Sequence, residues 1–373
     1  MKIVCDREKL QDAYQTVAPV VPARSTKPIV QNVKIEAGPD GAYLLGTDIE
    51  ISIRVQADGI AVDKPGEAVL HNSRFGSILR ESNDETLTLD SDESGVKIKG
   101  ARSTFKLPSE DPREFPAAPA FKQSAYHLVS APLLRDVIRR TAFATDQESH
   151  RFALGGVLLE FSATDITAVG TDGRRMAVMK CAAQAVGGHD PKDATTIVPA
   201  RATSIIERAL ADETGECMLA LQGSSLIVKS ERTTISARLL EGKFPRWRDV
   251  FPQRSDVTRV EAPAGPLFAA IRQAAITTDE ESQGIDFAFS EGTLTLAAEA
   301  AQTGASHVEL PIAYSGEPLT ICLNHKFLGQ FFRVLNPESN VSIELQSAES
   351  AAVFSTEDGY RYVLMPLSRD EAG

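Results

Sequence analysis

The sequence predicts an α+β protein in which one unit, two helices packed on antiparallel sheet, is repeated three times. Three observations support this prediction. Two proline-rich segments divide the chain into stretches of similar length, each stretch opens with an amphipathic helix, and each contains a strand that runs into a second helix. The 373 residues also exceed what one ordinary core requires.

The two proline-rich segments mark the boundaries between the copies. They cover residues 108–125 and 242–256, and each contains a Phe-Pro step, Phe115-Pro116 in the first and Phe244-Pro245 in the second. The predicted domains are therefore residues 1–122, 123–254 and 255–373.

The first helix of each copy is predicted from apolar residues at helical spacing, which share one helix face. These residues are Leu10, Ala13 and Val17 in the first copy, Leu134, Val137, Ile138 and Thr141 in the second, and Phe268, Ile271 and Ala275 in the third. We expect these side chains to face the core.

A strand pair follows the first helix and carries the same short segment in two copies. It reads Gly46-Thr47-Asp48 in the first and Gly170-Thr171-Asp172 in the second, whereas the third reads Thr295 to Ala298. Asp side chains accept backbone hydrogen bonds in turns. We therefore interpret Asp48 and Asp172 as turn caps and not as catalytic carboxylates.

The second helices follow a strand of apolar residues in all three copies. They are predicted from Phe75 to Glu81, from Arg201 to Leu210 and from Lys326 to Leu335. In the first copy, alternating runs at 86–89, 96–99 and 104–107, joined by a polar turn at 90–95, predict antiparallel strands.

The formal net charge is −12, from 39 Lys and Arg against 51 Asp and Glu. An acidic excess usually opposes binding to nucleic acid, unless the basic residues gather on one surface. Such a group of basic residues recurs on the predicted helices, with pairs seven apart in two of the second helices. Its members are Arg80, Arg135, Arg139, Arg201, Arg208, Lys326 and Arg333.

Exposed Lys and Arg often do no more than keep a helix face solvated. Their recurrence in three copies favours a common partner, and this surface suits a duplex DNA backbone bound without sequence preference. Cys5, Cys181, Cys217 and Cys322 lie far apart, so we expect buried reduced thiols and no metal or other cofactor. The charged amino terminus and the lack of a long apolar run predict a cytoplasmic protein without membrane contact.

Several segments together resemble the beta subunit of bacterial DNA polymerase III, the sliding clamp, over the whole length. They are Lys27-Pro28-Ile29, Gly46 to Glu50, Val169 to Val178, Gly242 to Pro245, and Tyr362 to Leu367. Each segment alone is weak evidence for the resemblance. Their order along a chain of three repeated units makes it specific. It implies a non-enzymatic processivity factor, a head-to-tail homodimer that closes as a ring around duplex DNA with helices lining the hole.

The resemblance also implies a hydrophobic cleft at the junction of the second and third domains, where polymerase III core, the clamp loader and other proteins with a clamp-binding motif would dock. Its residues would be Leu154, Thr171, Gly173, Arg174, Arg175, Met176, Pro245, Val250, Val363 and Met365, extended by Asn324, Phe327 and Leu367. The apolar members form a socket, and Arg174 and Arg175 orient polar groups at its rim. Ordinary core and turn residues would show the same pattern, so that alternative stays open.

Two further residue sets follow from the resemblance. The family places a DNA-contacting arginine at Arg24, whereas acidic residues at 146–148 and 279–281 are not expected to hold phosphate. The dimer contact, closed edge to edge by strands, would use Arg74, Ile78, Arg102, Phe105 and Leu107 on one side and Ile276 and Glu299 on the other.

Two other classes of function compete with a sliding clamp. An enzyme is disfavoured because the sequence has no P-loop, G-x-G-x-x-G, H-E-x-x-H or G-x-S-x-G motif, and the acidic cluster Asp90, Asp92 and Glu93 is best interpreted as a solvated turn. A repeat scaffold that binds only proteins remains open. Retention on circular DNA, with release after linearisation, separates a clamp from both.

Overall fold

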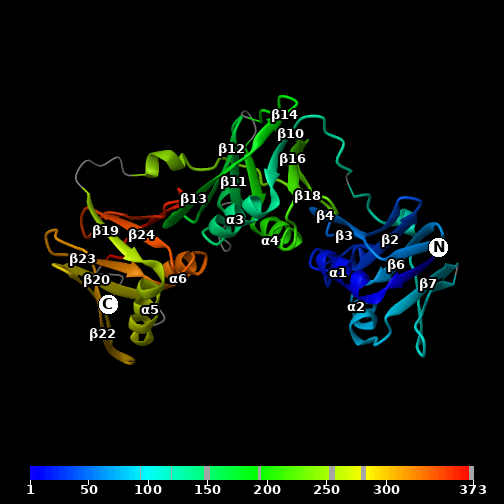
Figure 1. The fold of residues 1–373 in the computed structure, drawn as a ribbon, viewed down its shortest axis with the longest axis horizontal. Coiled ribbons are helices and arrows are strands. Elements are labelled where there is room, and N and C mark those ends of the chain that lie inside the picture. Colours follow the sequence, from blue (N-terminus) through cyan, green and yellow to red (C-terminus); the bar gives the residue numbers. More distant parts are fainter. Residues whose placement is uncertain are drawn as a thin grey trace. The chain divides into compact units, whose positions relative to one another are not determined.

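The structure is a computed structural model that describes residues 1–92, 94–118, 120–146, 152–191, 195–251, 257–278 and 283–368. Helices lie on antiparallel sheets, as predicted (Figure 1). The chain forms two compact units. Unit 1 comprises Met1–Arg135, Ser162–Thr164 and Ala182–Leu239, and unit 2 comprises Asp136–Phe161, Asp165–Cys181 and Leu240–Gly373. The division into three domains at the boundaries given above stays a prediction.

In unit 1 the first copy begins with strand β1 (Lys2–Asp6) and helix α1 (Arg7–Val17). The Asp6 carboxylate caps α1 by accepting a hydrogen bond from the Lys9 N–H at 3.1 Å. The three predicted core residues of this helix are all buried. Helix α2 (Asn72–Glu81) follows strand β6 (Gly66–His71) and packs beside α1, where Tyr14 meets Phe75 edge to face (Figure 1).

The strands of unit 1 form two sheets. One has the order β5-β1-β7-β8-β9, and the other has the order β14-β10-β16-β17-β18-β4-β3-β2-β6. Their bounds in the first copy are β2 (Asn32–Gly38), β3 (Gly41–Thr47), β4 (Ile51–Ala57), β5 (Ile60–Lys64), β7 (Thr86–Asp92), β8 (Gly95–Lys99) and β9 (Thr104–Leu107). In the second copy they are β10 (Tyr126–Ser130), β14 (Gln184–Val186), β16 (Glu216–Gln222), β17 (Ser225–Lys229) and β18 (Thr233–Arg238). The alternating runs predicted in the first copy are therefore confirmed as strands.

Unit 2 also contains two sheets, with the orders β11-β12-β13-β26-β25-β24-β19 and β22-β21-β20-β23. The strands of the first are β11 (Gly156–Phe161), β12 (Asp165–Thr171), β13 (Arg175–Ala182), β19 (Thr258–Pro263), β24 (Asn340–Leu345), β25 (Ala352–Ser355) and β26 (Arg361–Leu364). Those of the second are β20 (Gly284–Ser290), β21 (Thr293–Ala300), β22 (Gly304–Pro311) and β23 (Leu319–Asn324).

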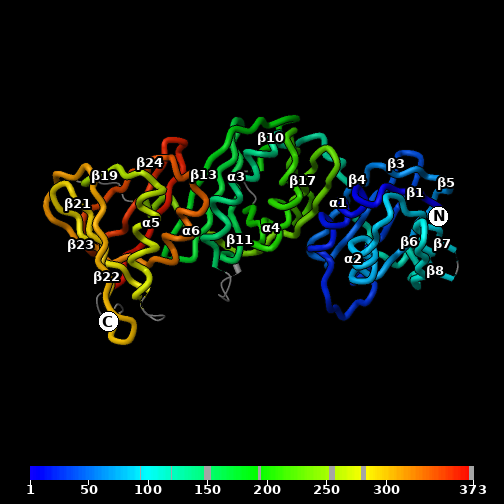
Figure 2. The backbone as a smooth tube through the Cα atoms, turned by 60° about the horizontal axis from the view of Figure 1, so that its bottom comes forward, coloured from blue at the N-terminus to red at the C-terminus, as the bar shows by residue number. Residues whose placement is uncertain are grey.

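The remaining helices complete the repeat. Helix α3 (Ala131–Ala142) begins in unit 1 and ends in unit 2, strand β15 (Thr196–Pro199) leads into α4 (Ala200–Ala209), and α5 (Ala264–Ala274) lies beside α6 (His325–Arg333) (Figure 2). Short 3-10 helices cover Pro28–Gln31, Pro112–Glu114, Phe152–Leu154, Trp247–Val250 and Ala275–Thr277. The predicted second helices are confirmed to within a few residues at each end.

The predicted core face of α5 was correct for one residue and wrong for two. Ile271 is buried, but Phe268 and Ala275 are only half-buried, and the buried stripe is instead Ala264, Leu267, Ala270, Ile271 and Ala274. The buried residues are mostly small, and the larger Phe268 gave the stronger apolar signal on a neighbouring stripe. Its ring stacks on Phe332 of α6 with centroids 5.8 Å apart, at the border of the core.

The copies are joined in the same way in both units, by a strand pair that makes one sheet continuous. In unit 1, β18 of the second copy pairs with β4 of the first, with Ile235 opposite Ile53. In unit 2, β26 of the third copy pairs with β13 of the second, with Val363 opposite Met176. Each junction thus joins the strand after a Gly-Thr-Asp turn to the last strand of the following copy.

Two strands of the same kinds lack such a partner in the part of the chain that the structure describes. Strand β22 occupies the position of β4 and β13 in the third copy, and β9 is the last strand of the first copy. Among the described residues, β22 pairs only with β21 and β9 only with β8. Both are therefore open sheet edges within one chain.

The cysteine prediction holds in part. Cys5, Cys181 and Cys217 are buried, whereas Cys322 is partly exposed. Burial raises the pKa of Cys5 and of Cys217 to about 12, so these thiols are protonated at neutral pH.

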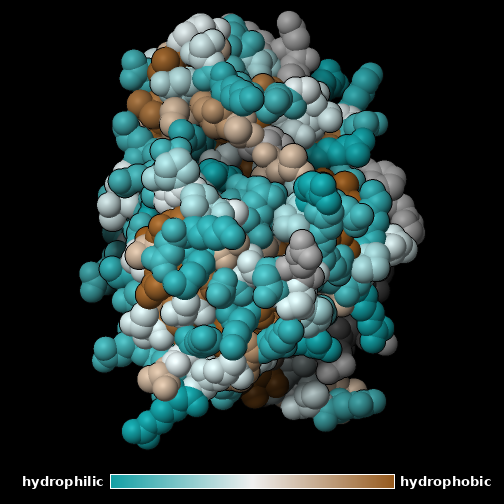
Figure 3. Space-filling view, turned by 90° about the vertical axis from the view of Figure 1, so that its right-hand side faces the viewer, coloured by the Kyte–Doolittle hydropathy of each residue, from teal (hydrophilic) through white to brown (hydrophobic). Residues whose placement is uncertain are grey.

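The face in Figure 3 carries mostly hydrophilic side chains with apolar ones in small groups. In the described part of the chain, no helix combines the length and apolar character that crossing a membrane requires.

Candidate functional site

The Gly-Thr-Asp segment of the second copy forms a tight turn before β13. The Thr171 hydroxyl donates to the Arg175 carbonyl at 2.6 Å, and the Asp172 carboxylate accepts from the N–H groups of Arg174 and Arg175, each at 3.0 Å. Gly173 adopts φ +90° and has no atom within 4 Å of where a Cβ would stand. The turn-cap interpretation of Asp172 is confirmed, and the turn leaves an open position at Gly173.

The first copy has the same turn with a different residue at its strained position. The Ile51 N–H donates to Asp48 at 2.7 Å, which confirms that interpretation, and the Ile49 N–H donates to the Thr47 hydroxyl at 2.9 Å. Ile49 has φ +86° and is 49% exposed. A β-branched residue is strained there, because its Cβ crowds the backbone at positive φ.

Arg175 does not lie at the rim, where the sequence placed it. Its side chain is buried, with Nε bonded to Asp172 at 2.9 Å, Nη2 to the Phe143 carbonyl at 2.8 Å, and Nη1 to Gln330. Its guanidinium also lies 4.1 Å from the centre of the Phe327 ring. Arg175 therefore links the turn to helix α6, while Arg174 remains exposed.

The segment that follows β26 runs beside this turn. The Met365 N–H donates to the Arg174 carbonyl at 2.9 Å, and the Leu367 N–H donates to the Cys322 carbonyl at the same distance. Met365 is 45% exposed, and Leu367 is half-buried. The segment thus presents apolar side chains next to Gly173 and Arg174.

The linker after the second copy is anchored at both ends of its 3-10 helix. Trp247 Nε1 donates to Glu160 on β11 at 3.2 Å, and Arg248 makes two hydrogen bonds to the same carboxylate, the shorter at 2.7 Å. Arg361 of β26 lies 3.8 Å from the centre of the Phe251 ring. Between these anchors Val250 is 49% exposed.

The predicted cleft residues therefore fall into two groups. Those accessible at the surface are Gly173, Arg174, Pro245, Val250, Phe327, Met365 and Leu367, and those buried are Leu154, Thr171, Arg175, Met176, Asn324 and Val363. Asn324 caps α6 by accepting from the N–H groups of Lys326 and Phe327 at 2.9 and 3.2 Å, which positions Phe327. The buried group supports the surface on which the accessible group lies.

The sequence reasoning missed the residues that hold the linker, namely Trp247, Arg248, Phe251, Glu160 and Arg361. One signal was available. The chain has a single Trp, and it stands between two arginines beside the second Phe-Pro step, a composition enriched at binding surfaces.

The predicted DNA-facing cations differ in how they are held. Arg139 bonds to Asp136 at 2.7 Å, Arg201 pairs with Asp48 at 2.8 Å, and Arg135 donates to the Ala211 carbonyl. Arg80 pairs with Glu81. Within the predicted set, the exposed cations with no ion pair or side-chain hydrogen bond to another described residue are Arg24, Arg208, Lys326 and Arg333. The acidic loops at 147–148 and 279–281 lie outside the described residues.

The predicted dimer residues are mostly exposed. Phe105 on β9 is 37% exposed and Ile276 is 77% exposed, whereas Ile78 is buried in the first copy. Arg74, Arg102 and Glu299 are exposed, and Leu107 is half-buried. Large apolar side chains therefore remain uncovered near both open edges, and Ile78 is not among them.

Comparisons with known proteins agree along the whole chain. Family models of the N-terminal, central and C-terminal domains of the DNA polymerase III beta subunit match residues 1–119, 129–246 and 248–368. The chain is 28% identical to the beta sliding clamp of Chlamydia pneumoniae over 368 residues, covering 98% of this chain and 99% of that protein. It is 29% identical to the beta sliding clamp of Pseudomonas putida over 372 residues, covering 98% and 100%.

Solved structures show the same fold. The DNA polymerase III subunit beta of Pseudomonas aeruginosa is 27% identical and matches with a TM-score of 0.88 over 99% of this chain and 100% of that chain. A sliding clamp from the same organism bound to griselimycin matches with a TM-score of 0.90 over 99% of each chain, at 27% identity. Since three domain models match in order over nearly all residues and solved relatives share the fold, the chain belongs to the DNA polymerase III beta subunit family.

Proposed function

We propose that the protein is a DNA polymerase processivity factor, a ring-shaped sliding clamp that encircles duplex DNA and tethers the replicative polymerase. The observation that carries this proposal is the repeated junction between copies. Two junctions of the same kind occur within one chain, the pairs β4·β18 and β13·β26. The strands that would form a third such pair are β22 and β9, and each is an edge strand within one chain.

A second copy completes both open edges. If β22 of each chain pairs with β9 of the other, two identical contacts form and no edge remains, which is a closed head-to-tail dimer. The exposed Phe105 and Ile276 lie at or beside these edges and would be covered on closure, since the 3-10 helix that carries Ile276 packs against β22. Arg74, Arg102 and Glu299 supply charges around the same contact.

The cleft serves as the docking site for polymerase III core, the clamp loader and other proteins with a clamp-binding motif. Val250, Phe327, Met365 and Leu367 offer apolar contacts beside the open backbone at Gly173. The griselimycin complex of the Pseudomonas aeruginosa clamp supports a ligand site on a protein of this fold. The ring stays on DNA because it is closed around the duplex, and it makes or breaks no covalent bond, so the proposal assigns no catalytic residues. The proposed location is the cytoplasm, where the DNA lies.

The proposal is tested by loading the protein onto nicked circular DNA with its clamp loader and isolating the complex by gel filtration. We expect retention on the circle and release when a restriction enzyme linearises it, because a ring can slide off an end. A mock-digested circle is the control. Retention that survives linearisation, or no retention on the circle, would contradict a clamp and favour a protein-binding scaffold.

A further inference from the structure

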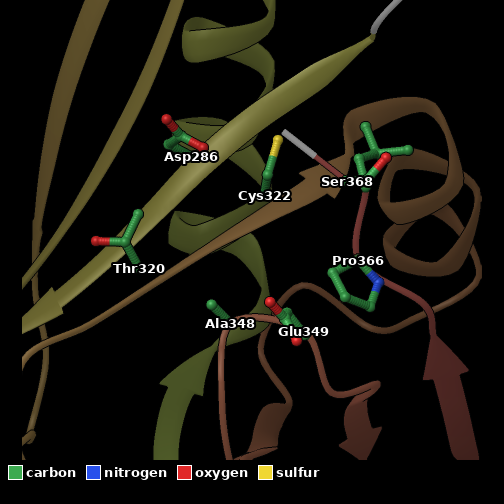
Figure 4. A pocket seen from close by; sticks show the side chains of 8 residues that line it. Asp286, Thr320, Cys322, Ala348, Glu349, Pro366 and Ser368 are labelled. Carbon is green, nitrogen blue, oxygen red and sulfur yellow. The ribbon is translucent and has the colours of Figure 1, made fainter. Parts of the chain in front are cut away.

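Unit 2 contains a pocket of about 620 Å³ next to the carboxyl-terminal part of the candidate cleft. It is lined by Asp286, Thr320, Cys322, Ala348, Glu349, Pro366, Leu367 and Ser368. Figure 4 shows side chains from three sources around it, namely strands β20 and β23, the loop with Ala348 and Glu349, and the last segment with Pro366 and Ser368. Its volume is within the range that binds small groups in proteins.

The pocket carries negative charge that nothing in the described chain neutralises. Asp286 stands opposite Cys322 in the β20·β23 register, and both belong to the sheet face away from buried Ile285 and Phe287. Asp286 and Glu349 make no ion pair or side-chain hydrogen bond with any described residue, and no Lys or Arg lines the pocket. By contrast, the acidic side chains at the 3-10 helix of the linker form ion pairs, Glu160 with Arg248 and Asp249 with Arg246.

The two carboxylates of the pocket suit a cationic side chain better than a metal ion. No three His, Cys, Asp or Glu side chains in the described ranges are grouped so that they could hold a metal. Two carboxylates beside a hydroxyl and an apolar wall of Pro366 and Leu367 instead suit a long side chain with a cationic end, which packs its methylene groups against apolar surface and keeps its charge near acceptors.

The pocket is continuous with the cleft through one short segment. Leu367 belongs to the predicted cleft and also lines the pocket, and Met365 lies two residues earlier at the cleft surface. The Leu367 N–H donates to the Cys322 carbonyl at 2.9 Å, which holds this segment against β23, and both residues line the pocket. Asp286 and Glu349 therefore line a pocket that adjoins the surface carrying Met365 and Leu367.

We propose that this pocket accepts a Lys or Arg side chain that flanks the clamp-binding motif of a partner. The inference deepens the proposed function, on which it rests. Asp286 and Glu349 thereby favour partners with a basic residue next to the motif, and the apolar cleft provides the common part of the affinity.

Calorimetry with three peptides tests this. All contain Gln-Leu-x-Leu-Phe, the kind of clamp-binding motif that the resemblance to sliding clamps leads us to expect. One has neutral flanks, one has Lys on the amino-terminal side and one has Lys on the carboxyl-terminal side. We expect one Lys peptide to bind about two- to fivefold more tightly than the neutral one, since exposed ion pairs contribute at most about 1 kcal/mol. The Asp286→Asn plus Glu349→Gln variant should remove that preference and leave the neutral peptide unaffected.

A control variant, Glu291→Gln plus Glu317→Gln, changes the net charge equally at exposed positions outside the pocket and should keep the preference. The proposal is overturned if neither Lys peptide binds more tightly, or if the preference survives the pocket variant. Failure of the neutral peptide to bind the native protein is a separate result, because it contradicts the proposed cleft and not the pocket alone.

Discussion

At the scale of residues, the paired turns show how one repeated segment serves two roles. Gly173 and Ile49 hold equivalent positions with φ +90° and +86°. Glycine adopts this conformation without strain, and at Gly173 it also leaves the backbone open to a partner. Ile49 has no such role in the proposed cleft and keeps the strain.

We predict that Ile49→Gly stabilises the protein by about 1 kcal/mol. Strain at positive φ costs about 1–3 kcal/mol. This outweighs the roughly 1 kcal/mol of extra chain entropy that glycine loses on folding. Because Ile49 is half exposed, its removal costs little apolar contact. The measurement is the calorimetric midpoint of thermal unfolding. Gly173→Ala is the matched control. No neighbouring atom crowds its added Cβ, and backbone strain at positive φ outweighs the entropy that alanine removes from the unfolded chain, so the midpoint should fall. A lower midpoint for Ile49→Gly would refute the account.

Arg175 gives the second prediction at this scale. Arg175→Leu removes the charged partner of Asp172, whose side chain is only 16% exposed and keeps its two backbone hydrogen bonds. We expect the free energy of unfolding to fall by about 3 kcal/mol, the lower end of the range for breaking a buried pair. The double variant Asp172→Asn plus Arg175→Leu should lose less than the sum of the two single losses. Thermal unfolding of the four proteins measures this, and strictly additive losses would mean that the pair does not stabilise the turn.

At the scale of elements, local pattern predicted the helices and strands but not their distant partners. Leu10, Ala13 and Val17 share a face whatever the rest of the chain does. The pairing of β26 with β13 depends on strands far apart in sequence, and alternating apolar residues do not specify which edge they join. The burial of Arg175 was missed for the same reason, since its partners Gln330 and Phe327 come from a distant helix.

The open edges β9 and β22 lead to the third prediction. Phe105→Asp plus Leu107→Asp places two carboxylates where the proposed contact buries apolar side chains, and unpaired charge is strongly disfavoured there. Sedimentation velocity should show a dimer for the native protein and a monomer for this variant. Val250→Asp, which changes an exposed apolar residue of the cleft, should remain dimeric. A variant at Phe105 and Leu107 that stayed dimeric would place the interface elsewhere.

At the scale of the whole molecule, charge divides between a general acidic excess and a recurring basic set. With a net charge of −12 the chain repels DNA on average, so attraction depends on those predicted DNA-facing cations that are not already neutralised. Arg139 and Arg201 have carboxylate partners, whereas Arg24, Arg208, Lys326 and Arg333 have none within the described ranges. A ring needs only weak contacts of this kind, because closure and not affinity keeps it on DNA.

The last prediction follows from this division. Changing Arg24, Arg208, Lys326 and Arg333 to Ala should flatten the dependence of DNA affinity on salt by about 0.9 in the log–log slope for each phosphate contact removed. The control changes Lys64, Lys97, Lys122 and Lys243, which lie on strands and loops, and should leave the slope nearly unchanged although net charge falls equally. Fluorescence anisotropy on short linear duplex over a range of salt concentrations measures both. Because retention on a closed circle is topological, the first variant, once loaded, should still stay on circular DNA and leave on linearisation. An unchanged slope would show that DNA meets a different surface, and loss from the intact circle would show that contacts, not closure, hold the protein there.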